Sequence, residues 1–246
     1  MEELETNFAF KTKNLKETKA VDVYYNCKYL GIIEYYHNQF HNKNCYLILK
    51  LEEYNKNFAK ELFRAFKELI GEPLQVMVES SEKEIIDFII AGKFLLKRRC
   101  YELNVRKKDL NGPLEANASL KRFYIDSDEY NESLNLLYKQ YELEHEKINP
   151  LTVDIKEFSK ILPGKVICLI ENGSVKDYAF IEENEIAYIG SIEVKEIDFF
   201  LSSLIDGLFK KFDNIVFESD DCSPAGMALM SMFKHNEETY NTYVLK

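Results

Sequence analysis

The chain has 246 residues, of which 46% are hydrophobic and 30% are charged, and its formal net charge is −10. This composition is typical of a globular protein with one large core or two smaller ones. The excess of acidic residues argues against nucleic acid as a partner, because neutralisation of phosphates dominates that kind of binding. No apolar run has the length of a membrane span, and residues 1–5 lack the basic start of a signal peptide. We therefore expect a cytoplasmic protein with no membrane partner.

The charge is divided unevenly along the chain. Residues 1–112 contain 19 Lys and Arg residues against 17 Asp and Glu residues, whereas residues 113–246 contain 13 against 25. An anionic ligand is therefore favoured in the first half and a cationic ligand in the second. The five cysteines are widely spaced without a CxxC pair, so neither a disulfide framework nor a metal site is predicted.

The first half starts with β-structure. Residues 8–10 predict a short edge strand, and residues 21–36 predict a hairpin of two strands. His37 and His41 follow at a spacing of four, but the asparagines around them predict a solvated loop and not a metal site. The pattern then predicts five elements in order, which are a strand at 46–51, a helix at 58–70, a strand at 74–79, a helix at 83–91 and a strand at 99–105.

The second half starts after a Gly- and Pro-containing linker at residues 109–118. Its patterns predict a short strand at 122–126, a helix at 129–147, a helical segment at 154–162, and a hairpin around Asn172-Gly173. The strand-helix-strand-helix-strand order of residues 47–105 then returns at residues 186–244 with a constant offset of 139 and no gap. We therefore predict two domains, at residues 1–112 and 113–246.

This order of elements resembles the GNAT-type N-acyltransferase superfamily, in particular its tandem members. The resemblance implies an α/β fold with mixed sheets, of the α+β kind, in which two tandem GNAT-like domains follow each other and the first is shortened at its N-terminus. It also implies acetyl-CoA or another acyl-CoA as co-substrate. In that superfamily a Q/R-x-x-G-x-G/A motif at a helix start holds the pyrophosphate with backbone amides.

In the first half, the stretch at 54–59 matches the position of that motif. Asn57 stands where the middle glycine would be, and asparagine tolerates the left-handed region best among the other residues. The cofactor-binding residues implied by the resemblance are Tyr54, Asn55, Lys56, Asn57, Phe58 and Ala59. In the second half, residues 192–198 contain three carboxylates and no glycine, so coenzyme A is not expected to bind there in the usual way.

The catalytic residues are less clearly marked. The tyrosine that the superfamily often uses as an acid is replaced by Ile89 in the first repeat and by Ala228 in the second. Glu218, at the end of a predicted strand, is a candidate base, with Asp220 and Asp221 beside it. His145 lies where the acceptor-binding segment of the superfamily would be. Our two candidate catalytic residues are therefore Glu218 and His145.

Two functions follow from these observations. The first is an N-acyltransferase that moves an acetyl or other acyl group from acyl-CoA to the amine of a small molecule or peptide. The alternative is a catalytically inactive tandem GNAT-like protein that binds a ligand or a partner, which is what degenerate motifs in both halves predict. The oligomeric state and the identity of the amine are left open by the sequence.

Overall fold

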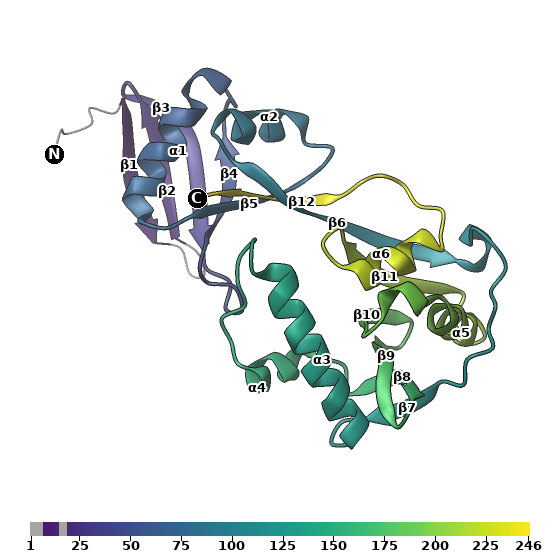
Figure 1. The fold of residues 1–246 in the computed structure, drawn as a ribbon. Coiled ribbons are helices and arrows are strands. Elements are labelled where there is room, and N and C mark those ends of the chain that lie inside the picture. The colour runs from purple at the N-terminus through teal and green to yellow at the C-terminus, as the bar shows by residue number, and fades with distance from the viewer. Residues whose placement is uncertain (1–6, 15–18) are drawn as a thin grey trace. The chain divides into compact units, whose positions relative to one another are not determined.

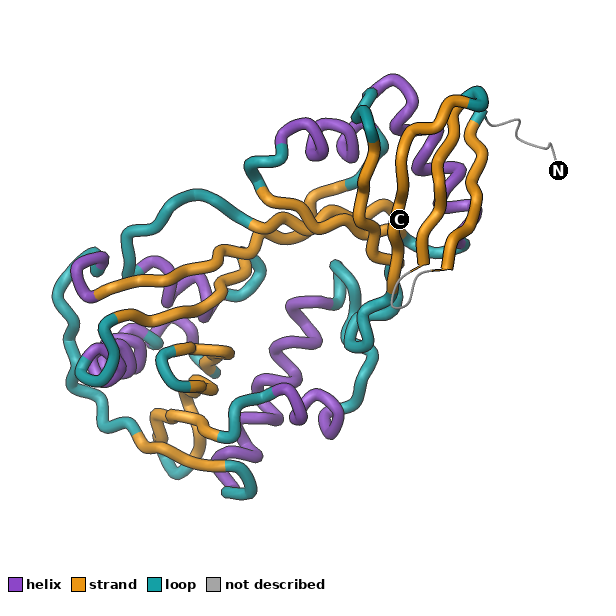
Figure 2. Tube along the Cα trace, turned by 180° about the vertical axis from the view of Figure 1, so that it is seen from behind, coloured by secondary structure: helices purple, strands orange, loops and turns teal. Residues whose placement is uncertain are grey.

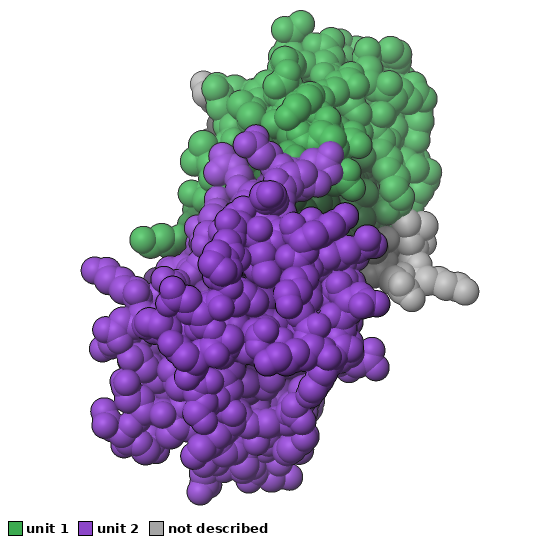
Figure 3. Space-filling view, turned by 90° about the vertical axis from the view of Figure 1, so that its right-hand side faces the viewer, with its two compact units in different colours: residues 1–98, 147–152, 240–246 green, residues 99–146, 153–239 purple. Residues whose placement is uncertain are grey.

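The computed structural model describes residues 7–14 and 19–246. Residues 1–6, where the sequence predicts no signal peptide, lie outside the described residues. The chain forms two compact units, which Figure 3 shows in different colours. Unit 1 consists of Met1–Arg98, Lys147–Thr152 and Tyr240–Lys246, and unit 2 consists of Arg99–Glu146 and Val153–Thr239. No helix within the described ranges has the length and apolar character needed to cross a membrane.

Unit 1 is a sheet with two helices on one face (Figure 1). The strand order is β1-β2-β3-β4-β5-β12, and β4 and β5 are parallel whereas the other neighbours are antiparallel. Its elements are β1 (Phe8–Asn14), β2 (Lys19–Tyr25), β3 (Lys28–Tyr36), β4 (Cys45–Leu51), α1 (Lys56–Ile70), β5 (Leu74–Glu79), α2 (Lys83–Ala91), the start of β6 (Leu95–Arg106), and β12 (Tyr240–Leu245).

The core of unit 1 forms because α1 is amphipathic. Phe58, Leu62 and Phe66 recur at helical spacing and are buried against the sheet. Asn55 caps the start of this helix, and Gly71 ends it in the left-handed conformation that glycine adopts most readily. The predicted helix at 58–70 and the strand at 74–79 are therefore confirmed, with the helix starting two residues earlier.

Residues Lys147–Thr152 return from the end of α3 to unit 1 and are held by buried polar groups. The Asn149 side chain donates to the His41 carbonyl at 2.8 Å, and a ring nitrogen of His41 lies 2.7 Å from the Asn149 carbonyl. His41 is only 8% exposed, and burial lowers its pKa. The prediction of a solvated loop is therefore wrong for His41, because a distant segment of the chain covers it. His37 is exposed and pairs with Glu72.

Unit 2 is a second mixed sheet, with strand order β6-β11-β10-β9-β8-β7. Figure 2 shows its strands in orange and its helices in purple. The helices α5 and α6 share one apolar core with the sheet, whereas α3 packs on other side chains of β9 and β10. Its remaining elements are β7 (Lys121–Tyr124), α3 (Asp128–His145), α4 (Ile155–Phe158), β8 (Lys165–Glu171), β9 (Ser174–Glu182), β10 (Glu185–Ser191), α5 (Asp198–Phe209), β11 (Asn214–Asp220) and α6 (Pro224–Ser231).

The repeat is present in both units, but it contains a gap. Val76 on β5 pairs with Tyr243 on β12, and Ile215 on β11 pairs with Val105 on β6. Val76 and Ile215 obey the offset of 139, whereas the counterpart of Val105 is Tyr243 and not the predicted Val244. A shift of one residue turns a strand's side chains to the opposite face, and it places Tyr243 in the core of unit 1. The gapless alignment is therefore wrong for the last strand.

Candidate functional site

In unit 2, the parallel strands β10 and β11 diverge. They pair only at Glu185 and Ile186 of β10, although β10 continues to Ser191 and β11 to Asp220. An irregularity next to Tyr188, where β10 pairs with β9, changes the direction of the side chains that follow. Ligands commonly bind at the carboxyl ends of parallel strands where neighbouring connections leave space. The carboxyl ends of β10 and β11 are therefore a candidate ligand-binding position.

A cavity of about 530 Å³ lies at these strand ends, within unit 2. Gln140 and Glu144 of α3, Tyr178 of β9 and Ser191 of β10 provide most of its polar atoms. Its remaining lining is largely apolar and consists of Leu136, Leu143, Ile192, Val194, Cys222, Pro224 and Ala225. An apolar cavity of this size with a few convergent polar groups is typical of a small-molecule site.

Glu144, like Tyr178, is a titratable group of this cavity whose protonation burial affects. Gln140 donates a hydrogen bond to its carboxylate at 2.9 Å, and the Tyr178 hydroxyl donates to the Gln140 side-chain oxygen at 2.9 Å. Burial raises the pKa of Glu144, and the nearby Asp220 carboxylate raises it further. The carboxylate is therefore a stronger base than an exposed glutamate.

The two candidate catalytic residues of the sequence lie on the same face of unit 2 but do not line the cavity. His145, at the end of α3, stacks on Tyr141 with ring centroids 4.0 Å apart, and its Nδ1 donates to the Tyr141 carbonyl at 3.0 Å. Glu218 is exposed on β11. Burial is the largest cause that raises the pKa of the Tyr188 phenol, and the nearby charge of Glu218 raises this pKa further. Since Tyr141 and Tyr188 are ring neighbours at 6.3 Å, Glu218 and His145 flank one aromatic pair.

The turn before α5 occupies the position at which the superfamily motif would bind pyrophosphate. Glutamates of this turn instead pair with the side chain of Lys176. The Lys176 ammonium lies 2.7 Å from Glu196, 3.1 Å from Glu171 and 4.0 Å from Glu193. Hydrogen bonds to Glu196 and Glu171 raise the pKa of Lys176. These carboxylates would repel a pyrophosphate group.

Asp177, the next residue of β9, is a further carboxyl group at this position. Its side chain is fully buried, and neither carboxylate oxygen has a hydrogen-bond partner of good geometry among the described residues. Burial raises its pKa, and the Ser191 hydroxyl offsets part of that effect. The residues at the start of α5 therefore do not fit the pyrophosphate of coenzyme A.

The start of α1 in unit 1, at the equivalent position of the first repeat, has fewer carboxylates in its first turn. Its first turn contains no acidic residue. Lys56 forms an exposed ion pair with Asp87 at 2.7 Å, a kind of pair that contributes only about 0–1 kcal/mol and can be exchanged for another anion. As in unit 2, the parallel strands diverge here, since β4 and β5 pair only over Cys45–Leu47. The charge at this helix start fits a phosphate.

The other residues of the stretch 54–59 mainly build the helix start. The Asn55 side chain accepts the Asn57 amide at 3.0 Å, and Asn57 is helical and not left-handed. The Tyr54 hydroxyl donates to the Leu49 carbonyl at 3.1 Å, and Phe58 is 6% exposed. Binding of the cofactor by Tyr54–Ala59 stays a prediction.

Sequence reasoning missed Gln140, Glu144 and Tyr178. The spacing of four between Gln140 and Glu144 on a predicted helix was a signal that they share a face. Nothing in the sequence indicates that Tyr178 on a strand would hydrogen-bond to that face.

Comparison with known proteins agrees with this fold. No family model and no curated protein sequence matches the chain. A solved GCN5-related N-acetyltransferase from Sphaerobacter thermophilus is similar over 95% of this chain and 82% of its own, with a TM-score of 0.56 and 9% identity. A GCN5-related N-acetyltransferase from Kribbella flavida has a TM-score of 0.49 and 11% identity, covering 96% of this chain and 89% of its own.

A tandem GNAT protein from the clavulanic acid biosynthesis pathway has a TM-score of 0.46 and 10% identity, covering 94% of this chain and 84% of its own. At these identities the similarity concerns the fold. The Sphaerobacter thermophilus structure shows that the chain has the fold of the GNAT-type N-acetyltransferases. The chain's own two units supply the tandem arrangement of two GNAT-like domains.

Proposed function

We propose that the protein is an acyl-CoA-dependent N-acyltransferase, in which unit 1 binds the acyl-CoA and unit 2 binds the amine that receives the acyl group. The observation that carries this assignment is the difference in acidic residues between two equivalent helix starts. The start of α1 has Lys56 and no carboxylate in its first turn. In unit 2, Glu193 and Glu196 of the turn before α5 and Glu171 of β8 already surround Lys176 of β9.

In unit 1, Tyr54, Asn55, Lys56, Asn57, Phe58 and Ala59 would hold the pyrophosphate of acetyl-CoA or another acyl-CoA. The positive end of the α1 dipole and the Lys56 ammonium favour an anion at this position. Acyl-CoA supplies the acyl group as a thioester, which is open to attack by an unprotonated amine. The amide C–N bond would form as the C–S bond breaks, and coenzyme A would leave as a thiolate that takes up the proton lost by the amine. Asp87 competes with the phosphate for Lys56, so its charge sets part of the affinity.

In unit 2, the cavity at the ends of β10 and β11 would bind the amine. Its apolar lining favours an acceptor with a hydrophobic body, and the Glu144 carboxylate favours a positive charge. Glu218, on the same face of unit 2 but outside the cavity lining, would add to the negative potential there. Glu144 would take the proton from the ammonium, because its raised pKa makes it the stronger base. His145 would position Tyr141, on which it stacks.

A second candidate function is ligand binding without catalysis. The observation that favours it is that groups at both helix starts already have partners within the chain. Asn55 binds the Asn57 amide, Asp87 binds Lys56, and glutamates bind Lys176. A catalytically inactive protein of this kind would still bind a small molecule in the cavity of unit 2, but it would not transfer an acyl group to it.

Thermal unfolding with acetyl-CoA tests the cofactor assignment. We expect the wild-type melting temperature to rise, since ligand at 100 times its Kd adds about 2.7 kcal/mol of stability. Lys56→Glu should reduce this rise, because it places a carboxylate beside the phosphates. Asp87→Asn should increase it at the same ligand concentration, because it releases Lys56.

The matched control is Lys60→Glu, which changes the same charge one turn further along the exposed side of α1. It should alter the ligand-induced rise much less than Lys56→Glu. An equal rise in melting temperature with acetyl-CoA in Lys56→Glu, Asp87→Asn and wild type would contradict binding of the cofactor at the start of α1. The absence of any shift at millimolar acetyl-CoA would leave the inactive binding protein as the better account.

A further inference from the structure

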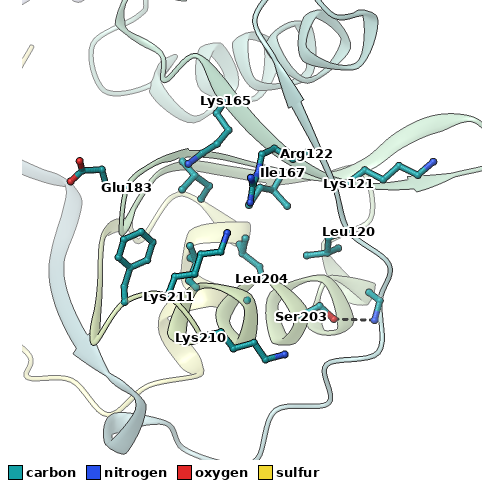
Figure 4. A pocket seen from close by; sticks show the side chains of 15 residues that line it. Leu120, Lys121, Arg122, Lys165, Ile167, Glu183, Ser203, Leu204, Lys210 and Lys211 are labelled. Atoms are coloured by element: carbon teal, nitrogen blue, oxygen red, sulfur yellow. Dashed lines mark hydrogen bonds between the residues drawn. The ribbon is translucent and has the colours of Figure 1, made fainter.

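A second cavity in unit 2 has an unusual concentration of positive charge. It has a volume of about 440 Å³ and lies between α5 and the strands β7, β8 and β9 (Figure 4). Five basic residues line it, against one acidic residue, Glu183, although residues 113–246 contain 13 Lys and Arg residues against 25 Asp and Glu residues. The five are Lys121, Arg122, Lys165, Lys210 and Lys211. The composition of this half of the chain does not account for such a cluster.

Three of these cations converge. In Figure 4 the charged ends of Arg122, Lys165 and Lys211 point into the hollow, whereas Lys121 and Lys210 point away from it. Lys210 pairs with Asp206. Within the described part of the chain, Arg122, Lys165 and Lys211 have no ion-pair partner, so the cluster is not neutralised by the protein's own carboxylates.

The floor of the cavity is apolar. On β8, Lys165 and Ile167 lie on the same face because side chains alternate along a strand, and Arg122 shares that face as the partner of Ile167 in β7. Ile181 and Leu204 lie deeper and are buried. A ligand would thus meet apolar surface below and three cations at the rim.

The hollow is kept open by a glycine of α5. A Cβ atom added at Gly207 would meet no atom within 4 Å, although Gly207 lines the cavity. Glycine within a helix is less favourable than alanine. A larger residue would thus fill open space and favour the helix as well.

We propose that this cavity binds an anionic amphiphile, which is a small molecule with a carboxylate or phosphate head on an apolar body. The volume is within the range of small-molecule sites, about 300–1,000 Å³. The head would lie among Arg122, Lys165 and Lys211, and the apolar body would cover Ile167, Leu204 and their neighbours. This site is separate from the cavity at the ends of β10 and β11, and the proposal does not depend on whether the protein catalyses acyl transfer.

Titration calorimetry of the full chain with four probes tests the proposal. Octanoate and octyl phosphate carry both features, octanol lacks the charge, and inorganic phosphate lacks the apolar body. We expect at least one charged octyl compound to bind roughly tenfold more tightly than octanol and than inorganic phosphate. Preference for octanoate would indicate a carboxylate ligand, and preference for octyl phosphate a phosphate ligand. Octanol binding as tightly as both charged compounds, or no binding by either of them at millimolar concentration, would overturn the proposal.

Two variants locate the site. Gly207→Leu should abolish binding while the melting temperature stays the same or rises, so that loss of binding is separated from unfolding. The double variant Lys165→Gln with Lys211→Gln should weaken binding about tenfold. Lys139→Gln with Lys195→Gln removes the same charge from exposed positions of unit 2 outside the cavity and should leave the affinity within about twofold of wild type. Unchanged binding in Gly207→Leu would place the ligand elsewhere.

Discussion

Replacing Glu144 by glutamine should lower kcat for acyl transfer by about 10²- to 10⁴-fold, the usual contribution of a positioned base. The assay would follow acetyl-CoA consumption with n-hexylamine as acceptor, since the cavity combines apolar walls with a carboxylate. The wild-type rate should increase with pH through the raised pKa of Glu144, because only the ionised carboxylate accepts a proton. Glu144→Gln should lack this step in the pH profile.

Loss of activity in this variant should not reflect unfolding. The pKa of Glu144 is higher in the folded chain than its ordinary value of 4.5. The folded state therefore binds more protons, and Glu144 lowers stability as the pH rises from about that value through the folded pKa. Glutamine removes this cost, so the variant should be at least as stable as wild type at pH 7. Glu142→Gln, on an exposed position of the same helix, is the matched control. Full activity of Glu144→Gln would exclude Glu144 as the base.

The largest effect on stability is expected for Gly31→Ala in unit 1. Gly31 has φ +130°, and an added Cβ would meet the Lys50 carbonyl oxygen and lie 2.7 Å from the Leu51 Cα. The backbone strain contributes about 1–3 kcal/mol, and the forced separation of β3 from β4 contributes about 1–3 kcal/mol more. This is a large fraction of the usual stability of a domain, about 5–15 kcal/mol. Hydrogen exchange should be accelerated in peptides of β3 and β4.

Two other glycines separate the causes. Gly71 has φ +80° but nothing within 4 Å of an added Cβ, so Gly71→Ala should show the cost of strain alone. Gly112 has neither feature, and Gly112→Ala should be close to neutral. Equal urea midpoints for Gly31→Ala and Gly71→Ala would show that the contact with β4 does not matter.

Elements with strong local patterns could be predicted from the sequence. The apolar period of Phe58, Leu62 and Phe66 fixed the buried face of α1, and Asn172-Gly173 formed the expected tight turn with φ of 52° and 85°. Local signals suffice for such features because neighbouring residues determine them.

Features that depend on distant pairing could not be predicted in this way. No local sequence pattern indicates that β12 pairs with β5 through Tyr243 and Val76. Nor does a local pattern indicate that a segment around Asn149 buries His41. These contacts join residues more than a hundred positions apart. The one-residue gap before β12 could not be predicted from the aligned repeat either, because only the pairing of β12 with β5 and of β6 with β11 reveals it.

The candidate site shows the same division. Glu218 and the acidic turn at 192–198 could be singled out from local sequence patterns, because one lies on an apolar strand and the other before a helix. The roles that the sequence assigns to them stay predictions. The role proposed for Glu144 could not be predicted from the sequence, because its raised pKa arises from burial and from Asp220, which only the fold places near it. The ion pairs of Lys176 with Glu171 and Glu196 could likewise not be predicted, because only the fold brings these residues together.

Hydrogen exchange of the chain with and without acetyl-CoA tests most directly whether the cofactor binds at the start of α1. The account predicts slower exchange of amides in residues 54–59 on addition of acetyl-CoA, and no change in residues 192–198. Protection of residues 192–198, or unchanged exchange in residues 54–59 under saturating acetyl-CoA, would contradict it.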